Sequence, residues 1–209
     1  SDTVENSPAT WVEFTTKKSP IGDDAKGTLA GYTGVYDGNP HDAITGAAQT
    51  GYTVEYSTTN ATSGFSGTMP KVTSVADSKT VWVKLSKADH EAKVFEMTAT
   101  VTAKSIFGAT ITYGTQNTYN GTEQDVVITS VELDGTTLTS SDYAVDLTTS
   151  KATNVKEKTL KITGKGNYTG TTTAATAWSL VAKDVTITPD AKSKTYGAAD
   201  PTLTYTTDI

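Results

Sequence analysis

Short runs of alternating apolar and polar residues recur along the chain, and polar, glycine-rich segments separate them. Alternation sends successive side chains to opposite faces of an extended chain, which is typical of β-strands with one buried face. The first half of the chain has such runs at residues 52–56, 80–85 and 94–101, the last with Phe95, Met97, Ala99 and Val101 on one face. The second half has them at residues 109–113, 126–133, 143–147, 159–163 and 175–181. No apolar stripe of helical period is long enough to predict a long helix.

The polar segments predict the connections between these strands. Residues 57–68 form a long loop, residues 87–91 and 164–170 form turns, and residues 20–24 form a turn or linker. The dipeptide Asp134-Gly135 lies between two strand-like runs. It predicts a β-hairpin, because Asp-Gly is favoured in tight two-residue hairpin turns.

A tyrosine followed by a tight-turn sequence recurs and organises the chain into units. Residues 36–41 read Tyr-Asp-Gly-Asn-Pro-His, residues 119–124 read Tyr-Asn-Gly-Thr-Glu-Gln, and a more distant version at 196–201 reads Tyr-Gly-Ala-Ala-Asp-Pro. At similar separations, Ala103-Lys104 matches Ala182-Lys183, and Asp89-His90 matches Asn167-Tyr168. Self-similarity at a nearly fixed period is the sequence signature of repeat proteins. A tyrosine present in each version is more typical of architecture than of ligand binding.

The recurrence divides the chain into four segments. Residues 1–24 are an N-terminal strand or linker, 25–104 a first β repeat, 105–184 a second β repeat, and 185–209 the start of a third, incomplete repeat. The abundance of Thr, Val, Tyr and Gly favours strands throughout. We therefore expect an all-β fold of tandem Ig-like β-sandwich repeats, with β-grasp-like repeats that contain one short helix as the alternative.

Composition and charge narrow the classes of function. The 209 residues include no cysteine, which excludes disulfides, thiolate metal sites and cysteine nucleophiles. The net charge is −6, and all 17 cationic residues are lysine. Because arginine is the preferred reader of phosphates and base edges, we expect no nucleic-acid partner. No run approaches the roughly 20 apolar residues of a membrane span, so we also expect no membrane insertion in this segment.

No constellation of side chains predicts catalysis. His41 follows a proline in the recurring turn and His90 lies in a polar connection, so both are expected to be ordinary loop histidines. A glycosidase would need two carboxyl groups facing each other across a cleft, and a small sandwich offers little cleft. The acids that an ion could use, Asp37, Asp42 and Asp142, belong to no calcium-loop motif. We therefore expect no enzyme, no metal site and no cofactor.

Aromatic residues are the one candidate binding feature, because exposed aromatic rings can stack on sugar rings. Trp82 shares a strand face with Lys84, opposite the apolar residues of the same strand, and is therefore placed on the outer side. Trp11, in the polar N-terminal segment, is the second candidate. The alternative is that Trp82 packs under a loop or against a neighbouring unit. Trp178 shares a face with Leu180 and is predicted to lie in the core.

The recurring segments resemble repeats of bacterial surface proteins. Residues 36–41, followed by residues 52–57, resemble YDG-type repeats. Residues 119–121, 142–143 and 164–170 look like related repeats, and residues 196–205 are similar to the MBG ("mostly β, glycine-rich") repeats. A departure is His90, which stands where such repeats usually carry a tyrosine. The resemblance implies a secreted, often cell-wall-attached, multidomain bacterial protein of the adhesin-like kind.

Two functions from different classes remain open. The first is a non-catalytic extracellular repeat segment of a bacterial cell-surface or cell-wall protein, which acts as a stalk or spacer or presents a binding head. The second is a carbohydrate-binding module that uses an exposed aromatic face. The expected partners are a glycan or a host or cell-wall surface component, together with further repeats of the same parent chain.

Overall fold

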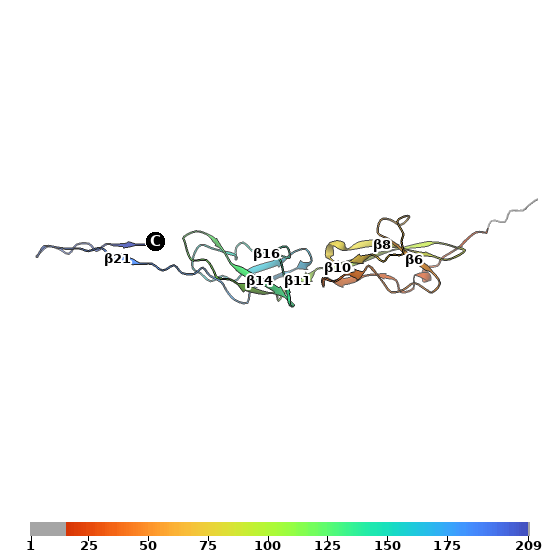
Figure 1. Cartoon of the computed structure of the whole chain (residues 1–209), viewed down its shortest axis with the longest axis horizontal. Helices are drawn as coiled ribbons and strands as arrows, with labels where there is room; N and C mark the ends of the chain where they lie inside the picture. The colour runs from red at the N-terminus through yellow and green to blue at the C-terminus, as the bar shows by residue number, and fades with distance from the viewer. Residues whose placement is uncertain (1–15, 209) are drawn as a thin grey trace, which may run out of the picture. The chain divides into compact units, whose positions relative to one another are not determined.

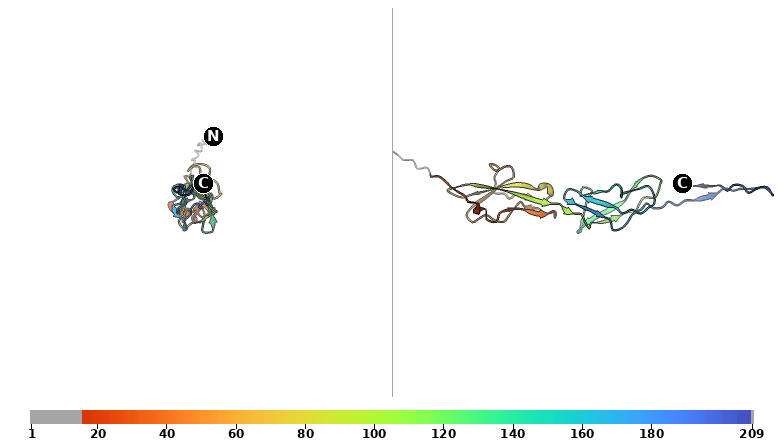
Figure 2. Two further views of the ribbon diagram at one scale, coloured as in Figure 1. Left: turned by 90° about the vertical axis from the view of Figure 1, so that its left-hand side faces the viewer. Right: turned by 180° about the vertical axis from the view of Figure 1, so that it is seen from behind.

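The computed structural model describes residues 16–208, and strands and loops make up almost all of them (Figures 1 and 2). The chain divides into two compact units, residues 1–102 and 103–209. The helical segments of the described part are two short 3-10 turns, η1 (Asp23–Lys26) and η2 (Val75–Asp77). The prediction of an all-β protein is confirmed. None of the helices in the described part has the length and apolar character needed to cross a membrane.

The first unit is organised around a four-stranded sheet of order β3-β10-β8-β6. Its strands are β3 (Thr33–Val35), β10 (Lys93–Thr102), β8 (Lys79–Ser86) and β6 (Thr53–Ser57). Strand β10 pairs parallel with β3 and antiparallel with β8, which in turn pairs antiparallel with β6. Three shorter pairs complete the unit: β1 (Ser19–Pro20) parallel to β9 (His90–Glu91), β2 (Ala30–Gly31) antiparallel to β5 (Ile44–Thr45), and β4 (His41–Asp42) antiparallel to β7 (Lys71–Val72).

The core of the first unit lies on the inward faces of β8 and β10. Every second residue of these strands is buried, as the twofold period of an extended chain requires; these residues are Val81, Val83, Leu85, Met97, Ala99 and Val101. Phe95 packs half-buried against the same cluster. The predicted shared face of β10 is therefore confirmed. Ile21, Leu29, Ala43, Ile44 and Val72 complete the cluster from the shorter strands and loops.

The second unit holds two three-stranded sheets. One has the order β12-β14-β15 and consists of β12 (Thr110–Tyr113), β14 (Ile128–Leu133) and β15 (Thr136–Thr137). The other has the order β16-β18-β20 and consists of β16 (Tyr143–Val145), β18 (Lys161–Gly164) and β20 (Thr171–Thr173). Strand β11 (Lys104–Ser105) pairs parallel with β19 (Tyr168–Thr169), and β13 (Gln124–Asp125) pairs antiparallel with β17 (Lys151–Ala152).

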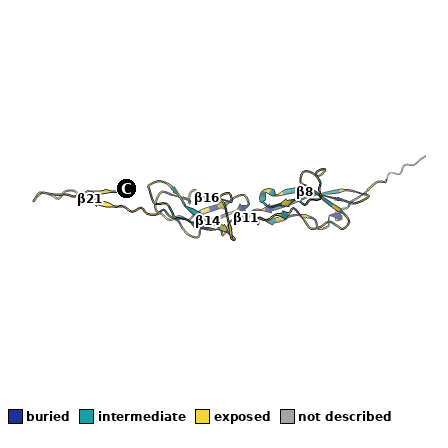
Figure 3. Cartoon of the chain, in the orientation of Figure 1, coloured by how far each residue is buried: buried dark blue, intermediate teal, exposed yellow. Residues whose placement is uncertain are grey.

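Buried residues of both sheets form the core of this unit (Figure 3). They include Ile111, Val131 and Leu133 from one sheet, Ile162 and Thr172 from the other, and Ile106, Leu160, Trp178 and Leu180 from the connections. The predicted hairpin at Asp134-Gly135 is present between β14 and β15. Both residues have positive φ, 49° and 77°, which is the turn geometry that matches the twist of paired strands.

A further antiparallel pair is formed by β21 (Ile187–Pro189) and β22 (Tyr205–Thr207) near the C-terminal end of the described residues. Its apolar side chains are exposed, with Ile187 at 61% and Tyr205 at 64%, and so is Leu203 just before β22, at 83%. The assignment of residues 185–209 to a third repeat stays a prediction.

Of the turn or linker predicted at residues 20–24, the structure shows the turn, and this turn belongs to the first unit. Strand β1 pairs with β9, and Ile21 and Ala25 are buried in the core of the first unit at 4% and 1% exposure. The Pro-Gly-Asp composition does mark a turn, η1, but that turn is anchored by its apolar residues. Lys104 likewise begins β11 of the second unit instead of closing the first. The turn predicted at residues 87–91 is shorter, because His90 and Glu91 form β9.

The prediction of a continuous strand at residues 175–181 is wrong. Ala174 donates its backbone N–H to Leu160 O at 2.8 Å, in register with the β18–β20 ladder, but the next bridge joins Lys158 to Trp178. Residues 175–177 therefore oppose a single residue of the neighbouring segment and form a wide bulge. The alternation correctly places Trp178 in the core, yet the run has no single neighbouring strand.

Candidate functional site

The recurring turn of the first unit is held by the carboxylate of Asp37. Its Oδ1 accepts the backbone N–H of Asn39 at 2.9 Å and lies 3.0 Å from Nε2 of His41. The His41 ring stacks on Tyr32 with the ring centroids 4.5 Å apart and the planes 13° apart. The hydrogen bond from the Asn39 backbone, followed by that from His41, lowers the pKa of Asp37 to about 2.

The second unit builds the same turn from neutral groups. Oδ1 of Asn120 accepts the backbone N–H of Thr122 at 2.9 Å and a hydrogen bond from Nε2 of Gln124 at 3.1 Å. Asn120 and Gln124 therefore take the places of Asp37 and His41. The two turns share one hydrogen-bonding scheme, but only the first builds that scheme from titratable side chains.

Through the tyrosine backbone, both turns attach to the segment near the end of each predicted repeat. The N–H of Tyr36 donates to Thr102 O at 2.8 Å, and the N–H of Tyr119 donates to Val181 O at 2.8 Å. The equivalence that the sequence predicted between these tyrosines is thus seen in their backbone pairing. It supports an architectural role for the position.

The third version of the turn lacks this scheme. Gly197 stands directly after the tyrosine, with φ of 80°, so no side-chain acceptor is available at that position. The Tyr196 side chain is fully exposed. An ion pair between Lys194 and Asp200 spans the turn instead. What it shares with the other two is the tyrosine and the positive-φ glycine that follows.

The matched dipeptides Asp89-His90 and Asn167-Tyr168 also occupy the same place in their units. Ser19 N–H donates to Asp89 O at 3.2 Å, and Lys104 N–H donates to Asn167 O at 2.9 Å. The first strand of each unit thereby pairs in parallel with the segment that includes the second residue of this dipeptide. The strand pairing is a property of the backbone and does not depend on whether histidine or tyrosine follows.

The side chains at that position differ in burial. Tyr168 is buried, with 9% of its surface exposed. His90 is only half-buried, and its Nδ1 lies 2.8 Å from the backbone O of Ala88. The histidine that departs from the repeat pattern is therefore accommodated by a local contact. It faces no acidic or nucleophilic partner among the described contacts that would make it a catalytic base.

Trp82, the first candidate for ligand binding, lies half-buried on the outer face of β8. Lys84 follows on the same face, forms an ion pair with Glu55 at 2.5 Å, and places its Nζ 4.8 Å from the centroid of the Phe65 ring. The outer placement predicted from the alternation is confirmed. Trp82 therefore shares an outer sheet face with the Lys84–Glu55 ion pair.

The other two tryptophans do not add to this face. Trp11, the second candidate, lies outside the described residues. Trp178 is buried at 3% exposure, as predicted, and its indole N–H donates to Thr149 O at 2.9 Å. Burial with a satisfied N–H is the usual state of a core tryptophan.

The acidic residues considered for an ion are held by separate partners. Asp42 forms an ion pair with Lys71 at 2.7 Å, and Asp142 accepts the backbone N–H of Thr139 at 2.8 Å. Asp37 is engaged in its turn. Within residues 16–208, no group of three or more histidine or acidic side chains is arranged to hold a metal ion. The structure therefore does not bring the three candidate acids together.

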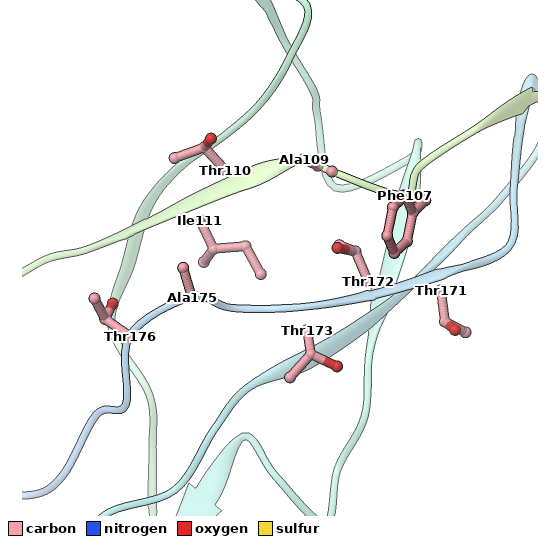
Figure 4. A pocket seen from close by; sticks show the side chains of 10 residues that line it. Phe107, Ala109, Thr110, Ile111, Thr171, Thr172, Thr173, Ala175 and Thr176 are labelled. Carbon is pink, nitrogen blue, oxygen red and sulfur yellow. The ribbon is translucent and has the colours of Figure 1, made fainter.

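A groove of about 690 Å³ crosses the second unit and was not predicted from the sequence (Figure 4). Its floor is buried and consists of Ala109, Ile111 and Thr172. Its rim is formed by Phe107, which is 80% exposed, and by Gly108, Thr110, Thr171, Thr173, Ala175 and Thr176. In Figure 4, Ile111 and Thr172 point toward each other from opposite sides of the space. No charged residue lines the groove.

The groove lies between two outer strands, because β12 and β20 each end the order of their sheet. The first unit covers the last residues of its strand β10. There β3 pairs with β10, and β2 approaches β10 so closely that a Cβ on Gly31 would lie 1.9 Å from Thr98 O. The matching glycine of the second unit is Gly114, which directly follows β12 and donates its N–H to Val127 O at 3.0 Å.

The sequence was compared with models of known protein families, and none matches. A search of curated proteins found no match either. The resemblance to YDG and MBG repeats therefore stays a prediction.

Proposed function

We propose that this chain is a non-catalytic structural segment of an extracellular bacterial surface protein, built of tandem Ig-like β-sandwich repeats of the YDG and MBG kind. In this role it spaces or presents a binding head carried elsewhere in the parent protein. The single observation that carries the proposal is that two successive units use the same backbone pairings where the chain enters and where it leaves. Each pairs its first strand with the segment after a late turn, and each fixes its tyrosine turn to its last segment.

The connection between the units is consistent with a serial array. Strand β10 ends at Thr102 and β11 begins at Lys104, so only Ala103 lies between them. In an array of this kind, each unit contributes its own core and loads are passed along the chain from one unit to the next. Ig-like layering is supported by residues 30–35 of the first unit, which pair first with β5 and then with β10 and so link two sheets.

The parallel pairing in the first unit suits a segment under tension. Strand β3 lies near the start of the unit and β10 at its end, and three residue pairs join them, from Thr100–Thr33 to Thr102–Val35. When the ends of the unit are pulled apart, parallel strands slide lengthwise and their hydrogen bonds are loaded together. In the second unit the corresponding contact is a single parallel bridge between Thr118 and Val181.

Force spectroscopy on the full chain, tethered through its two ends, tests the proposal. We expect two unfolding events that resist force, with the larger force belonging to the first unit. Replacement of Thr100 by proline, which removes the N–H that donates to Tyr32 O at 2.7 Å, should lower that larger force and leave the other unchanged. Extension of the chain without resistance would contradict a load-bearing role.

A second candidate function, carbohydrate binding, is favoured by one specific observation. Trp82 is half-buried on the outer sheet face that also carries the Lys84–Glu55 ion pair. Titration of the full chain with soluble glycans, followed by tryptophan fluorescence, tests it. A saturable change that is lost in Trp82→Ala and kept in Trp11→Phe would support binding at this face. Tryptophan fluorescence that does not change with any glycan would contradict carbohydrate binding, and the structural role would remain as the proposed function.

A further inference from the structure

The tyrosine turn of the second unit surrounds the side-chain oxygen of Asn120 with hydrogen-bond donors. Oδ1 accepts the backbone N–H of Thr122 at 2.9 Å, the Thr122 hydroxyl at 2.7 Å and Nε2 of Gln124 at 3.1 Å. Donors at such distances stabilise the negative charge that develops on a carbonyl oxygen when a nucleophile attacks its carbon. The turn therefore activates the side-chain amide of Asn120 toward addition at Cγ.

The next residue supplies a nucleophile for this carbon. The backbone nitrogen that follows an asparagine can attack Cγ and close a succinimide ring, and a glycine offers that nitrogen without a Cβ in the way. Asn120-Gly121 is the one Asn-Gly dipeptide of the sequence, and a Cβ added at Gly121 would meet the Tyr119 hydroxyl no closer than 4.0 Å. No acceptor within residues 16–208 takes the N–H of Gly121, so its nitrogen can react without breaking a hydrogen bond.

The leaving group and the second reactant are accessible at the same turn. In the described part of the chain, Nδ2 of Asn120, the nitrogen that would depart as ammonia, donates to no acceptor. Asn120, Gly121 and Thr122 are all exposed, so water reaches Cγ. The turn thus combines a polarised carbonyl group, an unhindered backbone nitrogen and an amide nitrogen that is free to leave.

Asn60 in the first unit provides a comparison within the same chain. Its Oδ1 also accepts backbone N–H groups, from Thr62 at 2.8 Å and from Ser63 at 2.7 Å. Its Nδ2, however, donates to Oγ of Ser63 at 2.9 Å, and the next residue is Ala61, which carries a Cβ. Asn60 therefore has donors like those of Asn120 but lacks the free amide nitrogen and the glycine.

The first unit shows that the product of the reaction fits this kind of turn. Asp37 stands where Asn120 stands in the second unit, and its carboxylate accepts the N–H of Asn39 at 2.9 Å. The N–H of Thr122 has the same place in the second turn. Because a hydrogen bond to a carboxylate is stronger than one to a neutral amide oxygen, an aspartate at position 120 would keep this donor. Loss of the amide therefore preserves the turn and adds one negative charge to it.

We propose that Asn120 is a modification site, at which the folded chain loses its side-chain amide spontaneously with water as the co-reactant. The Gly121 nitrogen gives its proton to solvent and forms a bond to Cγ, and Nδ2 takes up a proton and leaves as ammonia. Water then opens the succinimide ring. Cleavage of the bond between Cγ and the Gly121 nitrogen gives aspartate, and cleavage at the backbone carbonyl carbon gives isoaspartate. No atom is oxidised or reduced, and the inference does not depend on the structural role proposed above.

The test incubates the full chain in mildly alkaline buffer made with ¹⁸O-labelled water and follows peptide masses after digestion. We expect conversion of Asn120 to an acid that carries an ¹⁸O atom, together with an equal amount of released ammonia. Because the donors polarise the carbonyl group in the folded turn, this conversion should be at least as fast as in the same chain unfolded by denaturant. Asn60 should remain an amide over the same time.

A pair of matched variants tests the part that the donors play. Thr122→Val removes the hydroxyl that donates to Oδ1 of Asn120 and keeps the backbone N–H. We expect it to slow the conversion about five-fold, the rate ratio that corresponds to the loss of one hydrogen bond. The control is Thr153→Val, which removes an exposed hydroxyl elsewhere in the unit and should leave the rate unchanged.

Three results would overturn the proposal. Conversion of Asn120 in the unfolded chain but not in the folded one would mean that the turn protects the amide. Equal conversion at Asn60 would mean that neither the glycine nor the free amide nitrogen matters. Equal rates in Thr122→Val and the unaltered chain would mean that the donors around Oδ1 do not activate the carbonyl group.

Discussion

The first unit covers an edge of its strand β10, whereas the second unit leaves an edge of its strand β20 open. In the first, β3 covers β10, and Gly31 lets β2 lie directly against the backbone at Thr98. In the second, β12 stays apart from β20, and the space between them is the groove. Two units that share a turn scheme and a strand-pairing scheme therefore differ in which stretches of their outer strands are covered.

The recurring turn differs in the same manner, with one scheme and two chemistries. The first unit uses Asp37 and His41, and the second uses Asn120 and Gln124. The hydrogen-bonding geometry is the same in both turns, but the carboxylate and imidazole of the first are replaced by neutral amides in the second. Backbone pairing therefore defines the unit, and the side chains at equivalent positions of the turn determine whether its stability depends on pH.

The largest expected effect comes from Gly31→Ala. A Cβ at this position meets the Thr98 backbone, which cannot move without disturbing β10. We expect the first unit to lose about 3 kcal/mol of its free energy of unfolding, at the upper end of overpacking effects. The matched control is Gly67→Ala, where an added Cβ meets nothing within 4 Å. Denaturant unfolding of both variants measures the difference, and equal effects would contradict the close approach of β2 to β10.

A pair of proline substitutions compares the two edges directly. Thr100→Pro removes the N–H bonded to Tyr32 O and leaves that carbonyl without its donor, which should destabilise the first unit by about 2 kcal/mol. Thr173→Pro removes an N–H that faces the open groove, and should destabilise the second unit by less than about 1 kcal/mol. Unfolding monitored separately for each unit by NMR distinguishes the two. A large loss in Thr173→Pro would mean that the edge of β20 is already paired.

The smallest effect is expected from the charge in the turn. The pKa of Asp37 is about 2 in the folded chain against an ordinary value of 3.8. Its stabilising contribution is thus present above pH 3.8 and is lost as the pH falls through about 2. Asp37→Asn should therefore make the stability of the first unit less sensitive to acid in this range, and Asn120→Asp should make the second unit more sensitive. Thermal unfolding at pH 5 and at pH 2 to 3 measures both, and identical acid profiles for the original and altered chains would contradict the account.

Much of the fold could be predicted from local patterns in the sequence. The alternation at residues 80–85 and 94–101 places β8 and β10 and their buried faces, and Asp134-Gly135 places a hairpin, because both signals are local to the residues that carry them. Which strands pair is not a local property. The parallel pair of β1 with β9 and the split of residues 175–181 among different neighbours depend on contacts between distant segments, so the alternation alone could not reveal them.

The candidate site was predicted only in part. The outer position of Trp82 follows from its place in β8, whereas the groove arises from the distance between two strands that are far apart in sequence.

Amide hydrogen exchange in the full chain tests the central comparison most directly, since it needs no substitution. The N–H of Thr100, bonded to Tyr32 O at 2.7 Å, should be strongly protected. The N–H groups of Thr171 and Thr173, which face the groove, should exchange much faster, while Thr172 in the same strand is protected by β18. Protection of Thr173 equal to that of Thr100 would show that the second edge is closed, and would contradict the account.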